Sequence, residues 1–176
     1  RSLSEHGVRL HFMHGNRDFL VGSRFAAESG MQLLTDPTMV DLYGTPTLLM
    51  HGDTLCSDDI EYQKFRAMVR DPAWQRTFLA QPLAQRLRMA QDMRNLSEQA
   101  KQAKAMQIVD VTPATVEQTL RAHGYPRLIH GHTHRPARHE HHIDGRVCER
   151  WVLADWYEQG SCLACDAEGC RTLAVA

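Results

Sequence analysis

Several features that mark whole classes of protein are missing from this 176-residue sequence. It has no apolar run close to the roughly 18 residues that cross a bilayer as a helix. It has no excess of one charge: 20 basic and 21 acidic side chains leave a net charge of −1. That balance argues against binding nucleic acid through a large positive field. Its five cysteines are odd in number and follow no framework spacing, which argues against a disulfide-stapled secreted scaffold and favours a reducing compartment.

Histidine is the residue type in excess. The chain has eleven histidines, and seven of them fall between positions 123 and 142. Clustered imidazoles serve as metal ligands or as acid and base groups near neutral pH. The hydrophobic fraction of 43% is large enough for a sizeable core, so we expect one folded domain in which histidine carries the chemistry.

The apolar pattern predicts strands towards both ends of the chain and helices between them, which favours an α/β or α+β sandwich. Residues 57–109 have only helical patterning and lie between two loop motifs, so we expect a helical insertion over a site. Ser57 or Asp58 is the expected N-cap of its first helix, and Thr112 with Pro113 the expected start of the following helix. The expected strands are 8–13, 39–43, 47–50, 128–130 and antiparallel strands from 147 onward, and the expected helices are 1–7 (as a helix end), 24–29, 57–72, 74–80, 83–108 and 112–122.

Three loops share one design, in which a short apolar strand leads into a glycine turn that carries a polar side chain. The first loop carries Asn16, the second carries His51, and the third carries His132 and His134. A strand holds the backbone while the loop aims the side chain, and functional sites built in this way are well ordered. Two histidines two residues apart can serve adjacent ions, and mixed nitrogen and oxygen ligands suit Mn, Fe or Zn.

The remaining histidines and the cysteines are interpreted more plainly. A single histidine near a strand is more often a packed or surface residue than a ligand, and we interpret His139, His141 and His142 in this way. Cysteines 162, 165 and 170 leave open a hypothesis of another class, a non-enzymatic metal-binding module. A zinc knuckle needs a fourth ligand, however, and the alternating pattern around these cysteines is typical of strands.

Taken together and in this order, the three loops resemble the later motifs of the calcineurin-like metallophosphoesterases. Those motifs are Gly-Asn-His-Asp/Glu, a Gly-His pair after a strand, and Gly-His-x-His. The matching segments here are 15–18, 51–53 and 131–134. The resemblance extends from about residue 7 to about residue 160. It implies the α/β metallophosphoesterase fold, with the helical insertion at 57–109.

Arg17 departs from the superfamily pattern, which has a histidine at this position. With this arginine and the longer strings of sequence around the three loops, the chain resembles one branch of the superfamily. That branch hydrolyses UDP-2,3-diacylglucosamine to UMP and 2,3-diacylglucosamine 1-phosphate in the lipid A pathway. A guanidinium cannot act as an acid near pH 7, but it clamps phosphate oxygens as charge develops. It therefore suits a leaving group that needs no proton, such as a sugar 1-phosphate. Another phosphodiester or phosphomonoester remains the alternative substrate.

The resemblance also implies roles for individual residues. Two manganese ions would be bound, one by Asn16, His51 and His132 and the other with His134 among its ligands. Arg17 and His132 would be catalytic. The implied substrate contacts are Asn16, Arg17, Asp59, Ser97, Lys101, Lys104 and His132, although Lys101 stands where a shorter polar residue is expected.

Two further motifs of the superfamily, Asp-x-His and Gly-Asp with its bridging carboxylate, do not occur before residue 15. We therefore expect residues 1–176 to be the C-terminal part of one metallophosphoesterase domain, incomplete at its N-terminus. With only part of the ligand set, this chain by itself is expected to be inactive or a very poor catalyst.

The helical insertion carries a local positive charge. Residues 81–104 contain five basic and two acidic side chains, a balance of +3. This charge suits a diphosphate or an anionic membrane surface, and a merely solvated helix face is the plainer alternative. With the resemblance, it leads us to expect peripheral association with the cytoplasmic face of the inner membrane.

Overall fold

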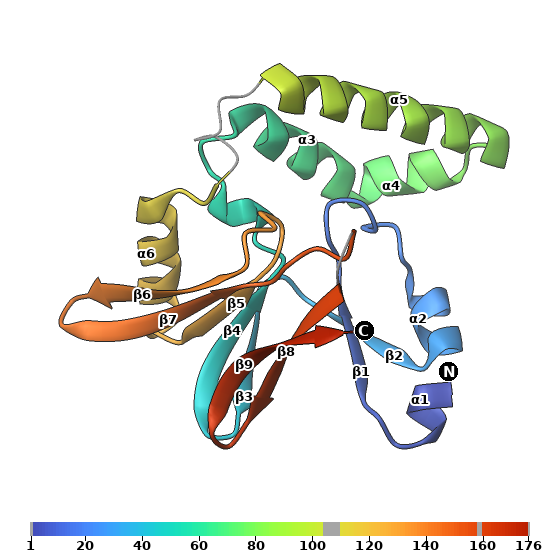
Figure 1. Cartoon of the computed structure of the whole chain (residues 1–176). Coiled ribbons are helices and arrows are strands. Elements are labelled where there is room, and N and C mark those ends of the chain that lie inside the picture. The colour runs from blue at the N-terminus through green and yellow to red at the C-terminus, as the bar shows by residue number, and fades with distance from the viewer. Residues whose placement is uncertain (1, 104–109, 158–159, 176) are drawn as a thin grey trace.

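The structure, a computed structural model, describes residues 2–103, 110–157 and 160–175 as a mixed α/β protein (Figure 1). Its elements in chain order are α1 (Ser2–Glu5), β1 (Leu10–Met13), α2 (Ser23–Ser29), β2 (Met31–Leu34), β3 (Thr38–Leu42), β4 (Thr45–Met50), the 3-10 helix η1 (Asp53–Leu55), α3 (Ile60–Arg70), α4 (Pro72–Leu79), α5 (Leu83–Ala103), α6 (Pro113–Ala122), β5 (Arg127–His130), β6 (Ala137–Ile143), β7 (Arg146–Val152), β8 (Gly160–Asp166) and β9 (Gly169–Val175).

The central sheet is mixed and has five strands in the order β3-β4-β5-β7-β6. Its inner strands β4, β5 and β7 run parallel, while β3 and β6 join antiparallel at the two edges. A parallel pair, β1 and β2, and an antiparallel hairpin, β8 and β9, form two further small sheets. The carboxyl ends of β4, β5 and β7 therefore lie together along one edge of the central sheet, the edge formed by the ends of the strands.

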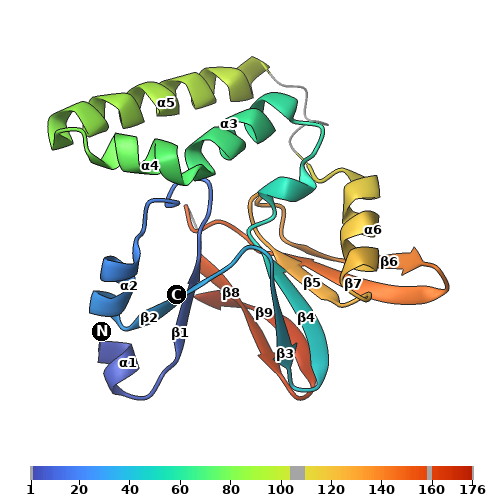
Figure 2. The same cartoon turned by 180° about the vertical axis from the view of Figure 1, so that it is seen from behind.

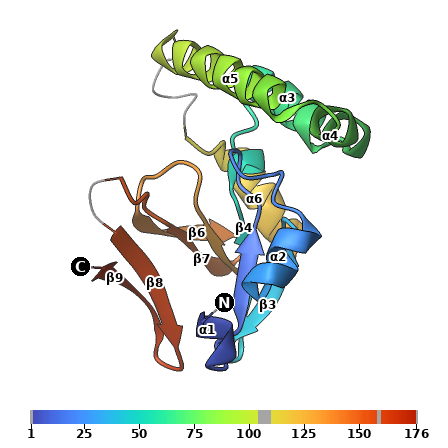
Figure 3. The ribbon, with the colours of Figure 1, turned by 90° about the vertical axis from the view of Figure 1, so that its right-hand side faces the viewer.

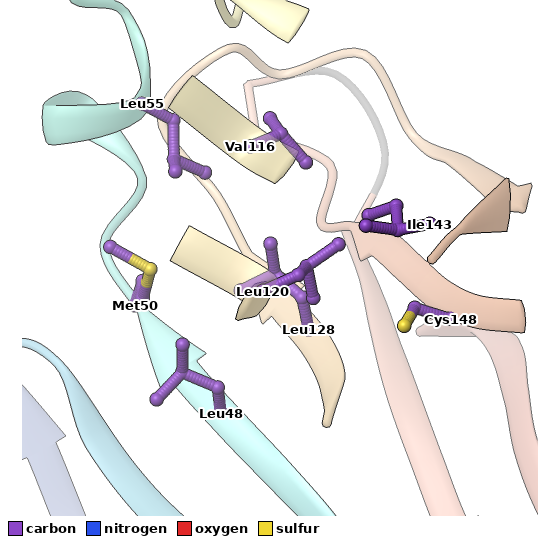
Figure 4. Close-up of a cluster of buried hydrophobic side chains, with 8 residues drawn as sticks. All are labelled: Leu48, Met50, Leu55, Val116, Leu120, Leu128, Ile143 and Cys148. Carbon is purple, nitrogen blue, oxygen red and sulfur yellow. The ribbon is translucent and has the colours of Figure 1, made fainter. Parts of the chain in front are cut away.

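Alternate residues of the inner strands face opposite sides of the central sheet, as the period of a strand requires. Leu48 and Leu128 belong to a buried cluster with Val116 and Leu120 of α6, and Figure 4 shows these side chains between the helix and the strands. Ile129, the residue after Leu128, faces the other side of the sheet and lines a cavity of about 510 Å³ against the β8–β9 hairpin. Figure 2 shows α6 and the hairpin on opposite faces of the sheet.

Helix α6 has the predicted start, but its side-chain capping differs from the prediction. Thr112 occupies the N-cap position before Pro113, yet its hydroxyl makes no cap hydrogen bond within α6. It accepts instead a hydrogen bond from the backbone N–H of Asp58 at 3.3 Å, which links the start of α6 to the loop that follows η1. Val116 and Leu120 lie four residues apart on the buried face, and burying each is worth about 1.5–3 kcal/mol.

Helices α3, α4 and α5 lie together at one end of the molecule, above the loops that leave β1 and β4 (Figure 3). The prediction that Ser57 or Asp58 caps α3 is wrong, because the carboxylate of Asp59 accepts from Tyr62 N at 3.2 Å. Helix α4 is capped by Asp71, which accepts from two backbone N–H groups of its first turn. Within the described residues, no helix is long and apolar enough to cross a membrane.

The predicted helices and strands are found with shifted ends, and two strands were not predicted. Helix α2 ends as expected at Gly30, which has φ of 73°. The long predicted helix begins at Leu83 as α5 and is described to Ala103, whereas 104–109 lie outside the described residues. Strands β2 and β6 were missed. Strand β6 carries mostly polar side chains, so its strand conformation depends on its pairing with β7.

Candidate active site

The three predicted loops meet because of the order of the strands. β4 and β5 are parallel neighbours, so the loops that leave their carboxyl ends start side by side. The backbone N–H of Gly131 donates to the carbonyl of His51 at 3.0 Å, which joins the second loop to the third. The first loop approaches so closely that a Cβ on Gly15 would lie 3.1 Å from Cε1 of His51. All three loops therefore lie at one edge of the central sheet.

Two of the predicted ligands, His51 and His132, face each other. Nε2 of His51 lies 3.2 Å from Nδ1 of His132, and the ring of Tyr62 lies 5.4 Å from that of His132. Burial lowers the pKa of His51, although the nearby carboxylates of Asp53 and Asp36 act in the opposite direction. The neutral imidazole that results is the form in which histidine binds metals.

The loop that carries Asn16 is held by hydrogen bonds to its backbone. The carboxylate of Asp18 accepts the N–H of Gly15. The guanidinium of Arg70 donates to the carbonyls of His14 and Gly15 at 3.1 and 3.0 Å. Half-buried Asn16 therefore follows directly on a residue that is packed against His51.

His134 contacts the segment that follows β7. Its Nδ1 lies 3.2 Å from the carboxylate of Asp155, and its ring lies 6.5 Å from the ring of Tyr157. The Tyr157 hydroxyl accepts a hydrogen bond from Nη1 of Arg17 at 3.2 Å. Tyr157 thus connects the first loop with the third.

The sequence interpretation missed Asp155 and Tyr157, because no motif surrounds them. They follow β7, which is a parallel neighbour of β5, so the chain leaves β7 at the same edge as the predicted loops. The backbone N–H of Leu153 donates to the carbonyl of His130 at 2.8 Å and fixes this approach. Only the strand order reveals that this segment belongs to the site.

Beneath the histidine pair lies a buried carboxylate cluster. Asp53 is fully buried and accepts from the Tyr62 hydroxyl at 2.7 Å and from Nε of Arg66 at 2.9 Å. Burial would raise the pKa of Asp53, but these two donors outweigh it and hold the pKa below its ordinary value. Asp36 accepts from the backbone N–H of His51 at 3.2 Å, and burial raises its pKa. Asp53 therefore remains ionised and orients α3 over the site.

One face of α3 covers the loops. Tyr62, Arg66 and Arg70 follow one another at four-residue intervals and so share this face. Each of them makes one of the loop contacts described above. Sequence interpretation missed them as site residues, and their spacing, with two cations and one phenol on one stripe, is the signal that was available.

The remaining predicted substrate residues lie on the helical segment. One carboxylate oxygen of Asp59 is engaged as the N-cap of α3, and its contact with substrate stays a prediction. Ser97 and Lys101 lie within α5, and Lys104 lies outside the described residues. Their predicted contacts also stay predictions.

The donor types at this edge fit a divalent cation in part. Nitrogen and oxygen donors come from the residues predicted as ligands, Asn16, His51, His132 and His134, and the first histidine is neutral near pH 7. Across residues 2–103, 110–157 and 160–175, no group of three or more His, Cys, Asp or Glu side chains is placed to hold an ion. An ion bound by the histidine pair therefore depends on Asn16 and on further donors.

Behind the third loop, a buried arginine is held by two histidines. Nη1 of Arg150 lies 3.1 Å from Nε2 of His130, and its Nε donates to Nε2 of His141 at 3.1 Å. Burial lowers the pKa of His130 to about 4, so the ring is neutral and accepts from the cation. For His141, the structural interpretation of the sequence is confirmed.

Comparison with known proteins gives close relatives but no matching family model. The chain is 55% identical over 168 residues to a UDP-2,3-diacylglucosamine hydrolase of Aromatoleum aromaticum, covering 96% of this chain and 69% of the relative. Proteins of the same name from Xanthomonas campestris and Stenotrophomonas maltophilia are 55% and 53% identical. Those matches cover 93% and 95% of this chain and 69% and 70% of the relatives.

Proposed function

The chain belongs to the UDP-2,3-diacylglucosamine hydrolase family, and on that premise we propose that it cleaves the diphosphate of UDP-2,3-diacylglucosamine to UMP and 2,3-diacylglucosamine 1-phosphate. The observation that carries the proposal is the contact of Arg17 with Tyr157, beside the loop of His132 and His134. This contact directs a permanent cation towards the loops where a diphosphate would bind.

The chemistry of Arg17 fits this substrate. Its guanidinium binds phosphoryl oxygens as negative charge develops on them, and the Tyr157 hydroxyl orients it. It donates no proton to the leaving group, because a guanidinium group stays protonated in proteins. A sugar 1-phosphate leaves without a proton, whereas a simple alkoxide does not. Asn16 and His132 contact the same diphosphate.

Two divalent ions, manganese by resemblance, supply Lewis-acid charge and an activated water when bound. Asn16, His51 and His132 hold one of them, and His134 belongs to the other. The carboxylate of Asp155, which lies 3.2 Å from Nδ1 of His134, favours one orientation of that ring. Because these four ligands are all neutral, we expect slow turnover from the 176-residue chain by itself.

The proposed architecture is the calcineurin-like metallophosphoesterase fold, with residues 57–109 as a helical insertion. The lipid part of the substrate fits this insertion, since Leu79, Leu83 and Leu87 are exposed on α4 and α5. Asp59, Ser97, Lys101 and Lys104 contact the substrate there. The protein acts at the cytoplasmic face of the inner membrane as a peripheral protein.

The test compares hydrolysis of UDP-2,3-diacylglucosamine with that of an aryl phosphodiester, with manganese present. We expect UMP release to be preferred, and the ratio of the two rates makes the result independent of slow absolute turnover. A preference for the aryl ester contradicts the proposal and favours a general phosphodiesterase.

A pair of histidine variants links activity to the site. His132→Ala is expected to lose both bound manganese and UMP release. His142→Ala, which changes an exposed histidine of β6, should keep both. Equal manganese content in the two variants, measured by elemental analysis, would place the metal elsewhere.

A further inference from the structure

The β8–β9 hairpin places two cysteine sulfurs against each other. Cys165 of β8 is paired directly with Cys170 of β9, and their Sγ atoms lie 2.8 Å apart. Opposite residues of antiparallel strands have Cα atoms about 4.5–5.5 Å apart. Disulfides join Cα atoms about 4.4–6.8 Å apart, so this pair can be bridged without movement of the backbone.

The third cysteine of the hairpin is not placed to compete. Cys162 is paired with Leu173 on the opposite strand. It lies three residues before Cys165 on β8, which is about 10 Å along a strand and on the other face of the hairpin. That separation exceeds the span of a disulfide, so the Cys-x-x-Cys sequence cannot close within this strand.

The surroundings give the two sulfurs different roles. Burial raises the pKa of Cys165 to about 12, and the adjacent Cys170 adds to this effect. The Cys170 sulfur receives an N–H from the guanidinium of Arg127 at 3.2 Å. The thiolate is the attacking form of cysteine, and burial disfavours that form at Cys165, so Cys170 is the partner suited to attack first.

We propose that Cys165 and Cys170 form a reversible intramolecular disulfide, with a low-molecular-weight disulfide as the oxidant. The Cys170 thiolate attacks one sulfur of that disulfide, which forms a mixed disulfide and expels one small thiolate. The Cys165 thiol then gives up its proton to solvent and attacks the Cys170 sulfur, and the second small thiolate leaves. The two protein thiols are oxidised by two electrons, and the small disulfide is reduced to two thiols.

The bridge would join the two strands next to the hairpin turn at Asp166–Gly169. Cys165 also lines the cavity between the hairpin and the central sheet, so oxidation alters the wall of that cavity. Both cysteines are only half-buried, which gives a small disulfide access to the pair and lets a reducing thiol reverse the bond.

The test treats the purified chain with oxidised glutathione, quenches it with acid and alkylates the remaining thiols under denaturing conditions. We expect two of the five cysteines to escape alkylation and, in a sample measured without alkylation, the intact mass to fall by two hydrogens relative to the reduced chain. Cleavage after Glu168, the glutamate between the two cysteines, should leave the flanking peptides linked until dithiothreitol is added.

Serine variants test the partners and the order of attack. Cys162→Ser should retain the linked peptides. Cys165→Ser should accumulate the glutathione adduct on Cys170. Cys170→Ser should form an adduct on Cys165 more slowly, by a factor on the order of ten or greater. The proposal is overturned if no thiols are lost, if the bond involves Cys162, or if oxidation yields only disulfide-linked dimers.

Discussion

At the scale of single residues, the third loop has a strained backbone. His132 and His134 have φ values of 66° and 53°, in the left-handed region that residues with a Cβ rarely occupy. Such a conformation costs about 1–3 kcal/mol per residue and persists only where the surroundings enforce it. Here the hydrogen bonds of Gly131 to His51 and of Leu153 to His130 hold the loop. Within this loop, the strain therefore falls on two of the predicted ligands.

Arg17 gives the first prediction at this scale. Arg17→Ala should lower the rate of UMP release by about 10²–10³-fold, because one preorganised charge-stabilising group is removed. Manganese content should not change, since the guanidinium is not a ligand. Steady-state assays with elemental analysis measure both quantities.

The matched control is Arg24→Ala on α2, an exposed arginine whose partner is the exposed Glu28. It should keep normal turnover. Arg17→Lys should recover only part of the rate, because an ammonium does not bind two phosphate oxygens as a guanidinium does. Near-normal turnover in Arg17→Ala would reduce Arg17 to a surface residue.

Gly52 gives the second prediction. It has φ of 106°, and a Cβ there would lie 2.7 Å from Nδ1 of His130 and 3.1 Å from the carbonyl oxygen of Gly131. Gly44 also has a positive φ, of 82°, but nothing lies within 4 Å of its Cβ position. Gly52→Ala should therefore lower the free energy of unfolding by about 1–3 kcal/mol more than Gly44→Ala does. Urea titrations of both variants measure the difference, and equal losses would mean that only the backbone conformation matters.

At the scale of the elements, Glu149 joins three strands of the central sheet. Glu149 lies on β7, and its carboxylate accepts hydrogen bonds from Nε of Arg127 on β5 at 3.0 Å and from Nη2 of Arg138 on β6 at 2.6 Å. Burial would raise the pKa of Glu149, but these donors and the indole N–H of Trp151 outweigh it and lower the pKa. The ionised carboxylate therefore stabilises the order of these strands.

Glu149→Gln should lower the free energy of unfolding at pH 7 by about 1.5–3 kcal/mol, the usual worth of hydrogen bonds to a charged group. A lowered pKa in the folded state means that this stability is present above the ordinary pKa of 4.5 and is lost as pH falls through the lowered value. The two unfolding free energies should converge in that acidic range. Glu140→Gln is the control, because Glu140 contacts the same Arg138 at the surface and should change little. A pH-independent difference would contradict the ionic role of Glu149.

At the scale of the whole molecule, the helical layer is the part suited to a lipid surface. Arg88 and Arg94 are exposed on α5, and Leu83 and Leu87 of the same helix are exposed as well. Cationic side chains near an anionic membrane each contribute about 1 kcal/mol, and salt screens this attraction. The layer therefore combines the two kinds of side chain that peripheral attachment uses.

We expect the protein to float with vesicles that contain anionic lipid, and to do so less at high salt. The double variant Arg88→Glu, Arg94→Glu should bind these vesicles at least about tenfold more weakly, by the same charge argument. The matched variant Arg24→Glu, Arg171→Glu reverses two exposed charges on α2 and β9 and should bind normally. Binding that depends on neither the charge of α5 nor salt would remove the helical layer from the membrane surface.

Much of the local structure followed from neighbouring residues alone. The end of α2 at Gly30 and the start of α6 at Pro113 depend on a glycine with positive φ and on a proline in the first turn, signals that act within a few residues. The three glycine loops with their polar side chains were equally visible, because each motif is contiguous. The resemblance they carry agrees with the relatives that comparison found.

Tertiary structure decided what comes together at these loops. Strand β6 was missed because its residues are mostly polar and gain their strand partner only from β7. Asp155 and Tyr157 reach the site because β7 is parallel to β5, and Tyr62 and Arg66 reach it because α3 packs over the loops. These contacts join residues that are distant along the chain. Pairing between distant segments depends on which surfaces pack against each other. The spacing of residues within one segment does not determine its partner.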